Sequence, residues 1–210
     1  MNPAPVKRGK FIVLEGIDGA GKSTHIDFIA ATIRAVHAVE VLITREPGGT
    51  PLAEKIRALV LHDPMDVRAE VLMVAAARLD HVQRCIGPAL DRGEWVLCDR
   101  FIDSTRAYQG GGGGVDLSWI DALHLQVCGS VIPDQVILFD LPAEIAAARR
   151  GARGGSADRF ETQDVAYFER VRDVYRNRMR PNGREKTAIV NAELDVSRIQ
   201  IDLEKIISSL

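Results

Sequence analysis

Short apolar runs rich in β-branched residues recur along the chain, separated by segments with helical periodicity. The runs cover residues 11–14, 39–44, 95–98, 135–139 and 188–190. Continuous apolar runs of this length are typical of parallel strands that are buried on both faces. Because the runs alternate with helical segments, they predict an α/β fold: a five-stranded parallel sheet with helices on both faces and right-handed crossovers.

The predicted helices cover residues 22–37, 51–61, 66–91, 142–150, 162–179 and 195–207, and a further helix opens at a capping box that starts with Ser118. Thr50 before Pro51 is a typical helix start, because threonine caps well and proline fits the first helical position. The glycine run 110–114 is compatible with a flexible loop or with a mobile segment beside a substrate. Glycine content alone does not decide between these two interpretations.

Composition limits the classes of protein that the chain can belong to. The 210 residues fit one domain, and the net charge of −2 excludes a strongly basic surface for nucleic acid. Cys85, Cys98 and Cys128 lack metal-binding spacing, so we interpret them as buried thiols in a reducing compartment. Since the apolar run at 11–14 is too short for a signal peptide or a membrane span, we expect a cytoplasmic protein without membrane contact.

The segment from Gly16 to Ser23, GIDGAGKS, matches the phosphate-binding loop pattern G-x-x-x-x-G-K-[ST]. It lies between a predicted buried strand and a predicted helix, where backbone N–H groups and a helix N-terminus favour phosphate. Lys22 is expected to reach the β- and γ-phosphates and Ser23 to bind Mg²⁺. The expected ATP-binding residues are Gly16, Ile17, Asp18, Gly19, Ala20, Gly21, Lys22, Ser23 and Thr24. Because no Asn-Lys-x-Asp motif is present, an ATP enzyme is favoured over a GTP switch.

Three further clusters lie where an open α/β sheet holds its ligands. Arg45 precedes a proline–glycine turn, and Asp99 and Arg100 follow the third predicted strand, where the acid suits a Mg²⁺ shell and the arginine a phosphate. A solvated arginine and a strand-end ion pair are the alternative interpretations. Arginines at 149, 150, 153 and 159 surround several glycines, which suggests a mobile lid around 149–161 or a disordered basic loop.

Five segments together resemble the bacterial type of thymidylate kinase. They are FIVLEGIDGAGKST, TREPGGTPLAEKIR, AEVLMVAAAR, WVLCDRFIDSTRAYQGGG and the DRFE at 158–161. This resemblance implies a single P-loop kinase domain over residues 1–210 that transfers the γ-phosphoryl of ATP to dTMP. It implies small-molecule partners, ATP and dTMP, with Mg²⁺ as the cofactor and pairing into a homodimer through the helix at 66–91.

The resemblance also implies residue roles. The dTMP-binding residues would be Asp18, Arg45, Val74, Arg78, Arg100, Thr105, Tyr108, Gln109 and Glu161. The catalytic residues would be Lys22 and Arg100 together with a lid arginine, and Arg149, Arg150 and Arg153 all remain open for that role. Ser23 and Asp99 would hold Mg²⁺, partly through water.

Two departures from the family pattern concern the acceptor. Val74 stands where many members have a phenylalanine that stacks on thymine, and Gly113 replaces an arginine seen in some relatives. Two other functions therefore remain as alternatives: a P-loop kinase of another small phosphorylated acceptor, and a non-catalytic nucleotide-binding regulator.

Overall fold

The computed structural model describes residues 7–129, 131–153, 158–179 and 186–210, and the side chain of Arg153 lies outside this description. Within these ranges the chain forms a five-stranded sheet in the order β2–β3–β1–β4–β5, in which every pair of neighbours is parallel. The strands are β1 (Phe11–Glu15), β2 (Val41–Arg45), β3 (Trp95–Asp99), β4 (Gln135–Asp140) and β5 (Lys186–Asn191). The predicted α/β sheet is confirmed.

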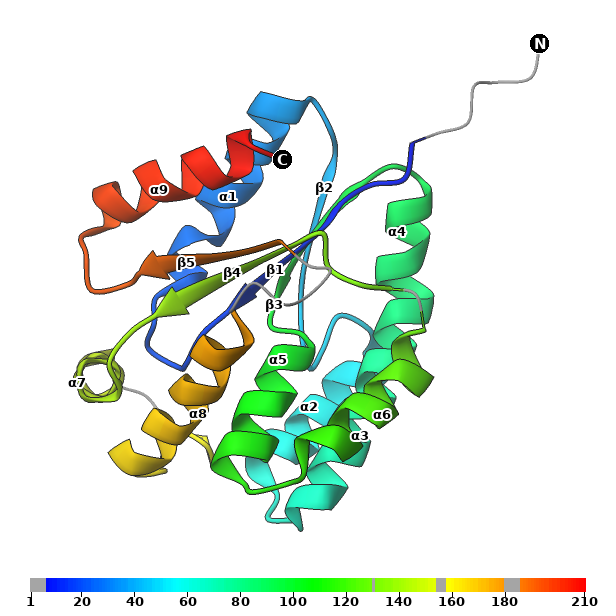
Figure 1. Cartoon of the computed structure of the whole chain (residues 1–210). Coiled ribbons are helices and arrows are strands. Elements are labelled where there is room, and N and C mark those ends of the chain that lie inside the picture. Colours follow the sequence, from blue (N-terminus) through cyan, green and yellow to red (C-terminus); the bar gives the residue numbers. More distant parts are fainter. Residues whose placement is uncertain (1–6, 130, 154–157, 180–185) are drawn as a thin grey trace.

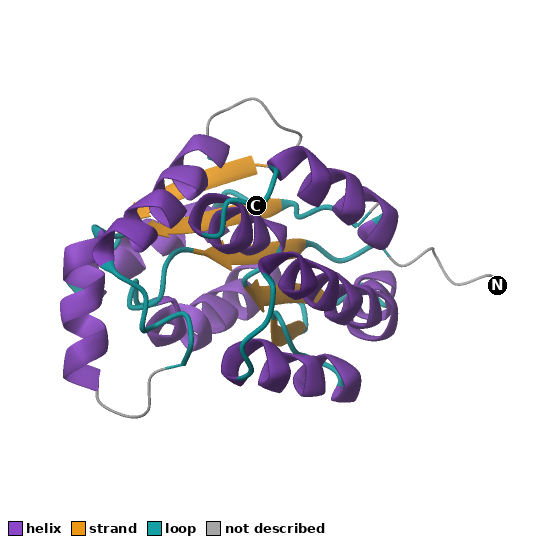
Figure 2. Cartoon of the chain, turned by 90° about the horizontal axis from the view of Figure 1, so that it is seen from below, coloured by secondary structure: helices purple, strands orange, loops and turns teal. Residues whose placement is uncertain are grey.

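Helices cover both faces of the sheet. They are α1 (Lys22–His37), α2 (Pro51–His62), α3 (Val67–His81), α4 (Gly87–Asp91), α5 (Ile102–Thr105), α6 (Leu117–Cys128), α7 (Ala143–Arg153), α8 (Val165–Arg178) and α9 (Val196–Ser208). Figure 1 shows α1 and α9 together on one side, with α4, α5 and α8 on the other side. Figure 2 shows from below that the sheet lies between these two layers.

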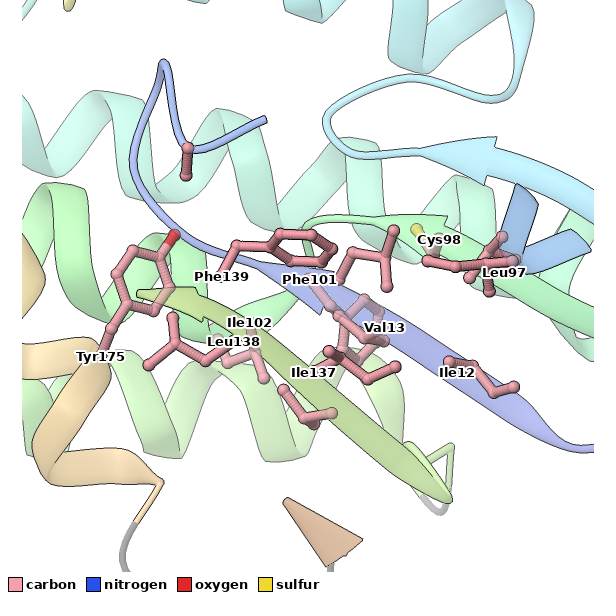
Figure 3. Close-up of a cluster of buried hydrophobic side chains, with 14 of the residues drawn as sticks. Ile12, Val13, Leu97, Cys98, Phe101, Ile102, Ile137, Leu138, Phe139 and Tyr175 are labelled. Atoms are coloured by element: carbon pink, nitrogen blue, oxygen red, sulfur yellow. The ribbon is translucent and has the colours of Figure 1, made fainter. Parts of the chain in front are cut away.

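The core follows the burial of the central strands. Every residue of β1 is buried, and so is all but the last residue of β3 and of β4, because helices cover both faces of these strands. Figure 3 shows this apolar layer, with Ile12 and Val13 of β1 beside Ile137 and Leu138 of β4. The edge strands β2 and β5 are only partly buried. This buried layer fixes the register of the central strands, so that their carboxyl ends lie next to one another.

The predicted helix at 66–91 is interrupted. Between α3 and α4 the chain makes a π-helical turn, η1 (Val82–Ile86), in which the Gly87 N–H donates to Val82 O. Pro88 is the second residue of α4 and has no N–H to donate to a carbonyl one turn back, so the preceding turn widens. The sequence predicted the helical content here correctly and missed the change of pitch.

The glycine run is not a loop. Most of it belongs to a second π-helical segment, η2 (Arg106–Gly112), which packs on α8. A Cβ on Gly111 would lie 2.6 Å from Val174 Cγ2, and one on Gly112 would lie 2.4 Å from Tyr167 Cε2. Both distances are too short for a real Cβ contact. Because glycine has no Cβ, η2 and α8 can pack this closely. The sequence left two interpretations open, and the helical structure excludes the flexible loop. Composition could not decide, because it does not distinguish flexibility from close approach.

Two helix ends also differ from the prediction. Asp116 caps α6, because its Oδ1 accepts from the Ser118 N–H at 2.6 Å, so the helix begins before the predicted capping box. Helix α7 continues past Gly151 to Arg153. In the part of the chain that is described, no helix is long and apolar enough to span a bilayer.

Candidate active site

The carboxyl ends of β1, β2 and β3 bring the sequence motifs together at one edge of the sheet. Asp99 pairs with Leu14 of β1 and with Arg45 of β2, so the phosphate-binding loop, Arg45 and Arg100 start from neighbouring positions. Two adjoining pockets open at this edge. The outer pocket lies against the phosphate-binding loop, and the inner pocket lies between α3 and η2. Both pockets are lined by Asp18, Glu46, Arg57, Leu61, Arg100 and Asp158.

The phosphate-binding loop has the geometry of an anion cradle. Gly19 and Gly21 have φ of 91° and 89°, a left-handed conformation that other residues rarely adopt. Helix α1 begins directly after the loop at Lys22, so its N-terminus adds a favourable dipole for anions. The Lys22 Nζ donates to Gly16 O at 2.8 Å, and burial together with the charge of Arg100 lowers the Lys22 pKa. Lys22, Ser23 and the loop residues from Asp18 onward line the outer pocket, whereas Gly16 and Ile17 contribute carbonyl groups behind it.

Asp99 and Ser23 could hold a cation in the outer pocket. The Asp99 Oδ1 is buried without a hydrogen-bond partner in the described structure and lies 4.0 Å from Lys22 Nζ. Carboxylate and hydroxyl oxygens are ligands that Mg²⁺ accepts. No cluster of three acidic, histidine or cysteine ligands occurs among the residues that the structure places. A Mg²⁺ ion here therefore fits only as one that also binds phosphate oxygens and water.

Asp18 and Arg100 meet where the two pockets join. The Arg100 Nη2 donates to Asp18 Oδ1 at 2.7 Å, and the Tyr108 hydroxyl donates to Asp18 Oδ2 at 2.7 Å. Although burial opposes ionisation, the charges of Arg100 and Lys22 hold the pKa of Asp18 well below its usual range. The Arg100 guanidinium also lies over the Tyr108 ring, 4.9 Å from its centroid. Asp18 is therefore an ionised acceptor next to a fixed cation.

The inner pocket is built around Arg78. Its Nε donates to Glu46 Oε2 at 2.6 Å, and its Nη2 donates to Phe101 O and to Thr105 Oγ1. Val74 and Gln109 also line this pocket, and the Gln109 amide donates to Glu70 at 3.1 Å. This donation orients the amide, whose oxygen remains an acceptor. The pocket thus presents cationic donors and one oriented amide within a largely apolar wall.

The predicted lid arginines reach different parts of the outer pocket. The Arg150 Nη1 donates to Asp18 O at 2.8 Å, and its guanidinium lies 3.9 Å from the centroid of the Phe168 ring. The Arg149 Nη1 donates to Ala192 O at 3.0 Å, on the loop after β5. Arg153 ends α7, but its side chain is outside the description. Arg150 therefore lies over the phosphate-binding loop, while Arg149 lies beside the loop at 192–196.

Two of the predicted acceptor residues line the outer pocket instead of the inner one. Arg45 is 55% exposed and pairs with Glu54 at 3.0 Å, and Glu161 lies on the segment after the lid glycines. The other predicted acceptor residues line the inner pocket: Asp18, Val74, Arg78, Arg100, Thr105, Tyr108 and Gln109. The predicted acceptor residues thus line one cleft but are divided between its two pockets.

Several residues of the cleft were not singled out from the sequence. Arg57 lines both pockets and donates to Pro47 O at 3.0 Å, and Glu46 links Arg78 to His81. Both residues lie within the segment TREPGGTPLAEKIR, so this motif could have identified them as residues of the cleft. Phe160 lines the inner pocket through its place in DRFE and packs edge-on against Tyr108.

Comparison with known proteins assigns the family. The family model for thymidylate kinase matches residues 14–202. The chain is 45% identical to a thymidylate kinase of Cupriavidus taiwanensis over 204 residues, covering 97% of this chain and 100% of that protein. It is 48% identical to a thymidylate kinase of Bordetella pertussis over 198 residues, covering 94% of each. The crystal structure of thymidylate kinase from Ehrlichia chaffeensis matches with a TM-score of 0.77 and 31% identity, over 95% of this chain and 98% of that one. With this match, the shared fold and the phosphate-binding loop, the chain belongs to the thymidylate kinase family.

Proposed function

We propose that this chain transfers the γ-phosphoryl of ATP to dTMP and releases dTDP. One observation carries the proposal: Arg100 and the ionised Asp18 lie at the junction of two pockets, next to Lys22. Phosphoryl transfer requires two anionic substrates to be held in line and their charge to be neutralised, with little covalent chemistry from the protein. A cationic junction between two pockets supplies that arrangement.

ATP would occupy the outer pocket. The backbone amides of the phosphate-binding loop and the N-terminus of α1 would bind its β- and γ-phosphates, with Lys22 as the adjacent cation. Ser23 and Asp99 would hold Mg²⁺, which neutralises charge that develops on the phosphates. Arg149 would lie near the nucleoside, since it is fixed beside the loop at 192–196.

dTMP would occupy the inner pocket with its phosphate toward Arg100. The ionised Asp18 would accept a hydrogen bond from the sugar 3′-hydroxyl, and the Tyr108 ring would crowd a 2′-hydroxyl. Arg78, Thr105 and Gln109 would face the base, because the arginine donates and the oriented amide oxygen accepts from an N–H. We assign Arg45 and Glu161 to the rim that the two substrates share.

Among the lid arginines we assign Arg150 to the transferred phosphoryl group. Its guanidinium lies over Phe168 and bonds to the carbonyl of Asp18, so it is held above the loop that would cradle the γ-phosphate. A fixed cation at that point stabilises charge that grows in the transition state. The lid around 149–161 would close over this group and exclude water as a competing acceptor.

A substrate panel tests the function. ADP release is coupled to a spectrophotometric readout with ATP, Mg²⁺ and dTMP, dUMP, dCMP or AMP as acceptor. We expect dTMP to give the highest kcat/KM. Equal turnover with another acceptor would favour the alternative that Val74 keeps open, a kinase of a different monophosphate. ATP binding without transfer to any acceptor would favour a non-catalytic regulator.

We also propose that the chain pairs as a homodimer through α3 and α6. Leu72 and Leu79 on α3 and Leu125 on α6 are exposed, and these two helices pack side by side. Exposed leucines on adjoining helices mark an interaction surface. Light scattering at micromolar concentration measures the mass, and a value for one chain would reject the pairing.

A further inference from the structure

Arg100 has an unusual backbone conformation for a residue with a side chain. Its φ is 72°, in the left-handed region, although it is neither glycine nor asparagine. The Arg100 N–H donates to Leu14 O at 2.8 Å, which ties this position to the end of β1. A residue in such a strained backbone conformation persists only where the surrounding structure holds it in place. The contacts of the Arg100 side chain are therefore of interest.

The guanidinium of Arg100 is held on two sides. Its Nη2 donates to Asp18 and to the Tyr108 hydroxyl, on the side that faces the pockets. Its Nη1 donates at 3.1 Å to Ser104 Oγ, which also lines the inner pocket, and at 3.1 Å to the hydroxyl of Tyr175, which lines neither pocket. The sequence placed Arg100, Asp18 and Tyr108 among the dTMP-binding residues but predicted neither set of contacts. The second set includes a residue of α8, which is distant in sequence from the other members.

The donors and acceptors available to Tyr175, Ser104 and Glu15 determine which hydroxyl donates in this second set of hydrogen bonds. The Ser104 hydroxyl lies 2.6 Å from Glu15 Oε2 and donates to this buried carboxylate. Arginine has only donors, so both hydroxyl oxygens accept from Nη1. When Glu15 is ionised, the one hydrogen of Ser104 is donated to its carboxylate, so the Tyr175 hydroxyl, 2.7 Å from Ser104 Oγ, donates to that oxygen. Burial and the charge of Asp103 raise the pKa of Glu15 to about 7. The resulting chain runs from Arg100 through Tyr175 and Ser104 to Glu15, and every hydrogen in it has an acceptor. Removing the Tyr175 hydroxyl therefore leaves Arg100 joined to Glu15 only through Ser104, and leaves Nη1 with one of these two partners.

Tyr175 is placed to act on the site without touching a substrate. It is 1% exposed and is not among the residues that line either pocket. Figure 3 shows its ring extending from α8 toward the core side chains at the end of β4, near Leu138. The same helix carries Phe168, which lies under Arg150. One helix thus contacts both the arginine assigned to the acceptor and the arginine assigned to the transferred group.

We propose that Tyr175 is a positioning residue for acceptor recognition, whose hydroxyl orients Arg100 together with Ser104 and Glu15. This proposal rests on the proposed function, because it assigns Arg100 to the phosphate of dTMP. Without the hydroxyl, the guanidinium keeps its contacts with Asp18, Tyr108 and Ser104 but loses one of the two partners of Nη1, so this nitrogen gains freedom. The acceptor then binds a less ordered cation, while the phosphate-binding loop is unaffected.

The test compares two conservative variants of α8. Tyr175→Phe removes the hydroxyl that contacts Arg100. Tyr167→Phe is the matched control, since Tyr167 is also a buried tyrosine of α8 and its hydroxyl donates to a backbone carbonyl, Tyr108 O, at 3.2 Å. Steady-state kinetics with ATP, Mg²⁺ and dTMP give separate KM values, and thermal unfolding reports on the fold.

We expect Tyr175→Phe to raise the KM for dTMP about tenfold, because hydrogen bonds that involve a charged group are among the stronger ones. The KM for ATP and the melting temperature are expected to match those of Tyr167→Phe. Adding Ser104→Ala to Tyr175→Phe should cost less than the product of the two single effects, because both act on one chain of hydrogen bonds.

An equal KM for dTMP in Tyr175→Phe and Tyr167→Phe, with active wild-type protein, would overturn the positioning role. A loss of affinity for both substrates would overturn it as well, since that pattern indicates general loosening of the structure. If the wild-type protein itself does not phosphorylate dTMP, the proposed function fails instead.

Discussion

Glu46 is the most consequential buried carboxylate of the inner pocket, and replacing it tests how the pocket is held together. It is 2% exposed and accepts from the Arg78 Nε at 2.6 Å, while its other oxygen lies 3.1 Å from the His81 Nδ1. Arg78 is 3% exposed and His81 is fully buried. Glu46→Gln keeps the shape of the side chain and removes the negative charge that lies between Arg78 and His81.

The expected loss of stability follows from this burial. Removing one partner of a buried ion pair typically costs about 3–5 kcal/mol, because the remaining charge stays desolvated. For a chain of this size, 1 kcal/mol changes the melting temperature by about 2–4 °C. We therefore expect Glu46→Gln to melt roughly 6–20 °C below the wild type at neutral pH.

The pH dependence gives a second and independent signature. Although burial disfavours the charged imidazole, contacts with Cys85 and Glu46 raise the pKa of His81 from 6.5 to about 9. The folded pKa lies above the unfolded one, so the stabilisation is complete below about pH 6.5 and disappears as the pH rises through 9. The shift corresponds to about 3 kcal/mol. In Glu46→Gln this decline between pH 6.5 and 9 should become smaller, because one of the two groups that raise the His81 pKa loses its charge.

Urea denaturation at pH 6.5 and at pH 9 measures both effects for wild type, Glu46→Gln and Glu54→Gln. Glu54 is the matched control, since it also pairs with an arginine of the same segment, Arg45, but both side chains are exposed. Exposed pairs contribute at most about 1 kcal/mol, so this control should stay close to wild type. A loss below 1 kcal/mol in Glu46→Gln, or an unchanged pH slope, would refute the reasoning.

Three further predictions concern the cleft and its packing. Lys22→Ala should lower kcat with ATP by at least a hundredfold at an unchanged melting temperature, since electrostatic stabilisation of the transition state is usually worth that much; activity within a few-fold of wild type would show that Lys22 has another role. Gly112→Ala should lower the free energy of unfolding by about 1–3 kcal/mol, because the added Cβ would lie 2.4 Å from Tyr167. Gly151→Ala is the steric control, because nothing lies within 4 Å of the new Cβ and the residue is helical, and equal losses would reject the packing argument. Chelation with EDTA should abolish transfer and Mg²⁺ should restore it, whereas turnover in EDTA would remove the need for a cation at Asp99.

The strand ends could be predicted because strong local signals specify them. An apolar run followed by GIDGAGKS, and another followed by Asp99 and Arg100, each place polar residues at a carboxyl end of a parallel strand. Parallel pairing then aligns these ends, which is why Lys22, Asp99 and Arg100 lie close together. The alignment depends only on the order of elements and on the burial of the strands.

Other features depend on contacts that no local pattern specifies. Tyr175 is one of several aromatic residues on α8, and only the packing of that helix brings its hydroxyl to Arg100. The glycine run could not be interpreted from the sequence for the same reason, since its glycines are explained by the side chains of α8 that approach them. Glu46 lies inside a motif that was recognised, yet its role depends on His81, which is 35 residues away in the chain.

Three arginines of the cleft are paired with protein carboxylates in this structure. Arg100 pairs with Asp18, Arg78 with Glu46 and Arg45 with Glu54, and the chain as a whole carries a net charge of −2. The guanidinium groups of Arg100 and Arg78 therefore need not become ordered when a substrate binds, because buried or partly buried carboxylates already hold them in place. Arg45 and Glu54 are exposed, so phosphate can replace that carboxylate at little cost. Such a site would bind its anions with preorganised donors, Arg100 and Arg78, where the pockets join, and with an adaptable donor, Arg45, at the rim. Transfer between two bound nucleotides requires both kinds of donor.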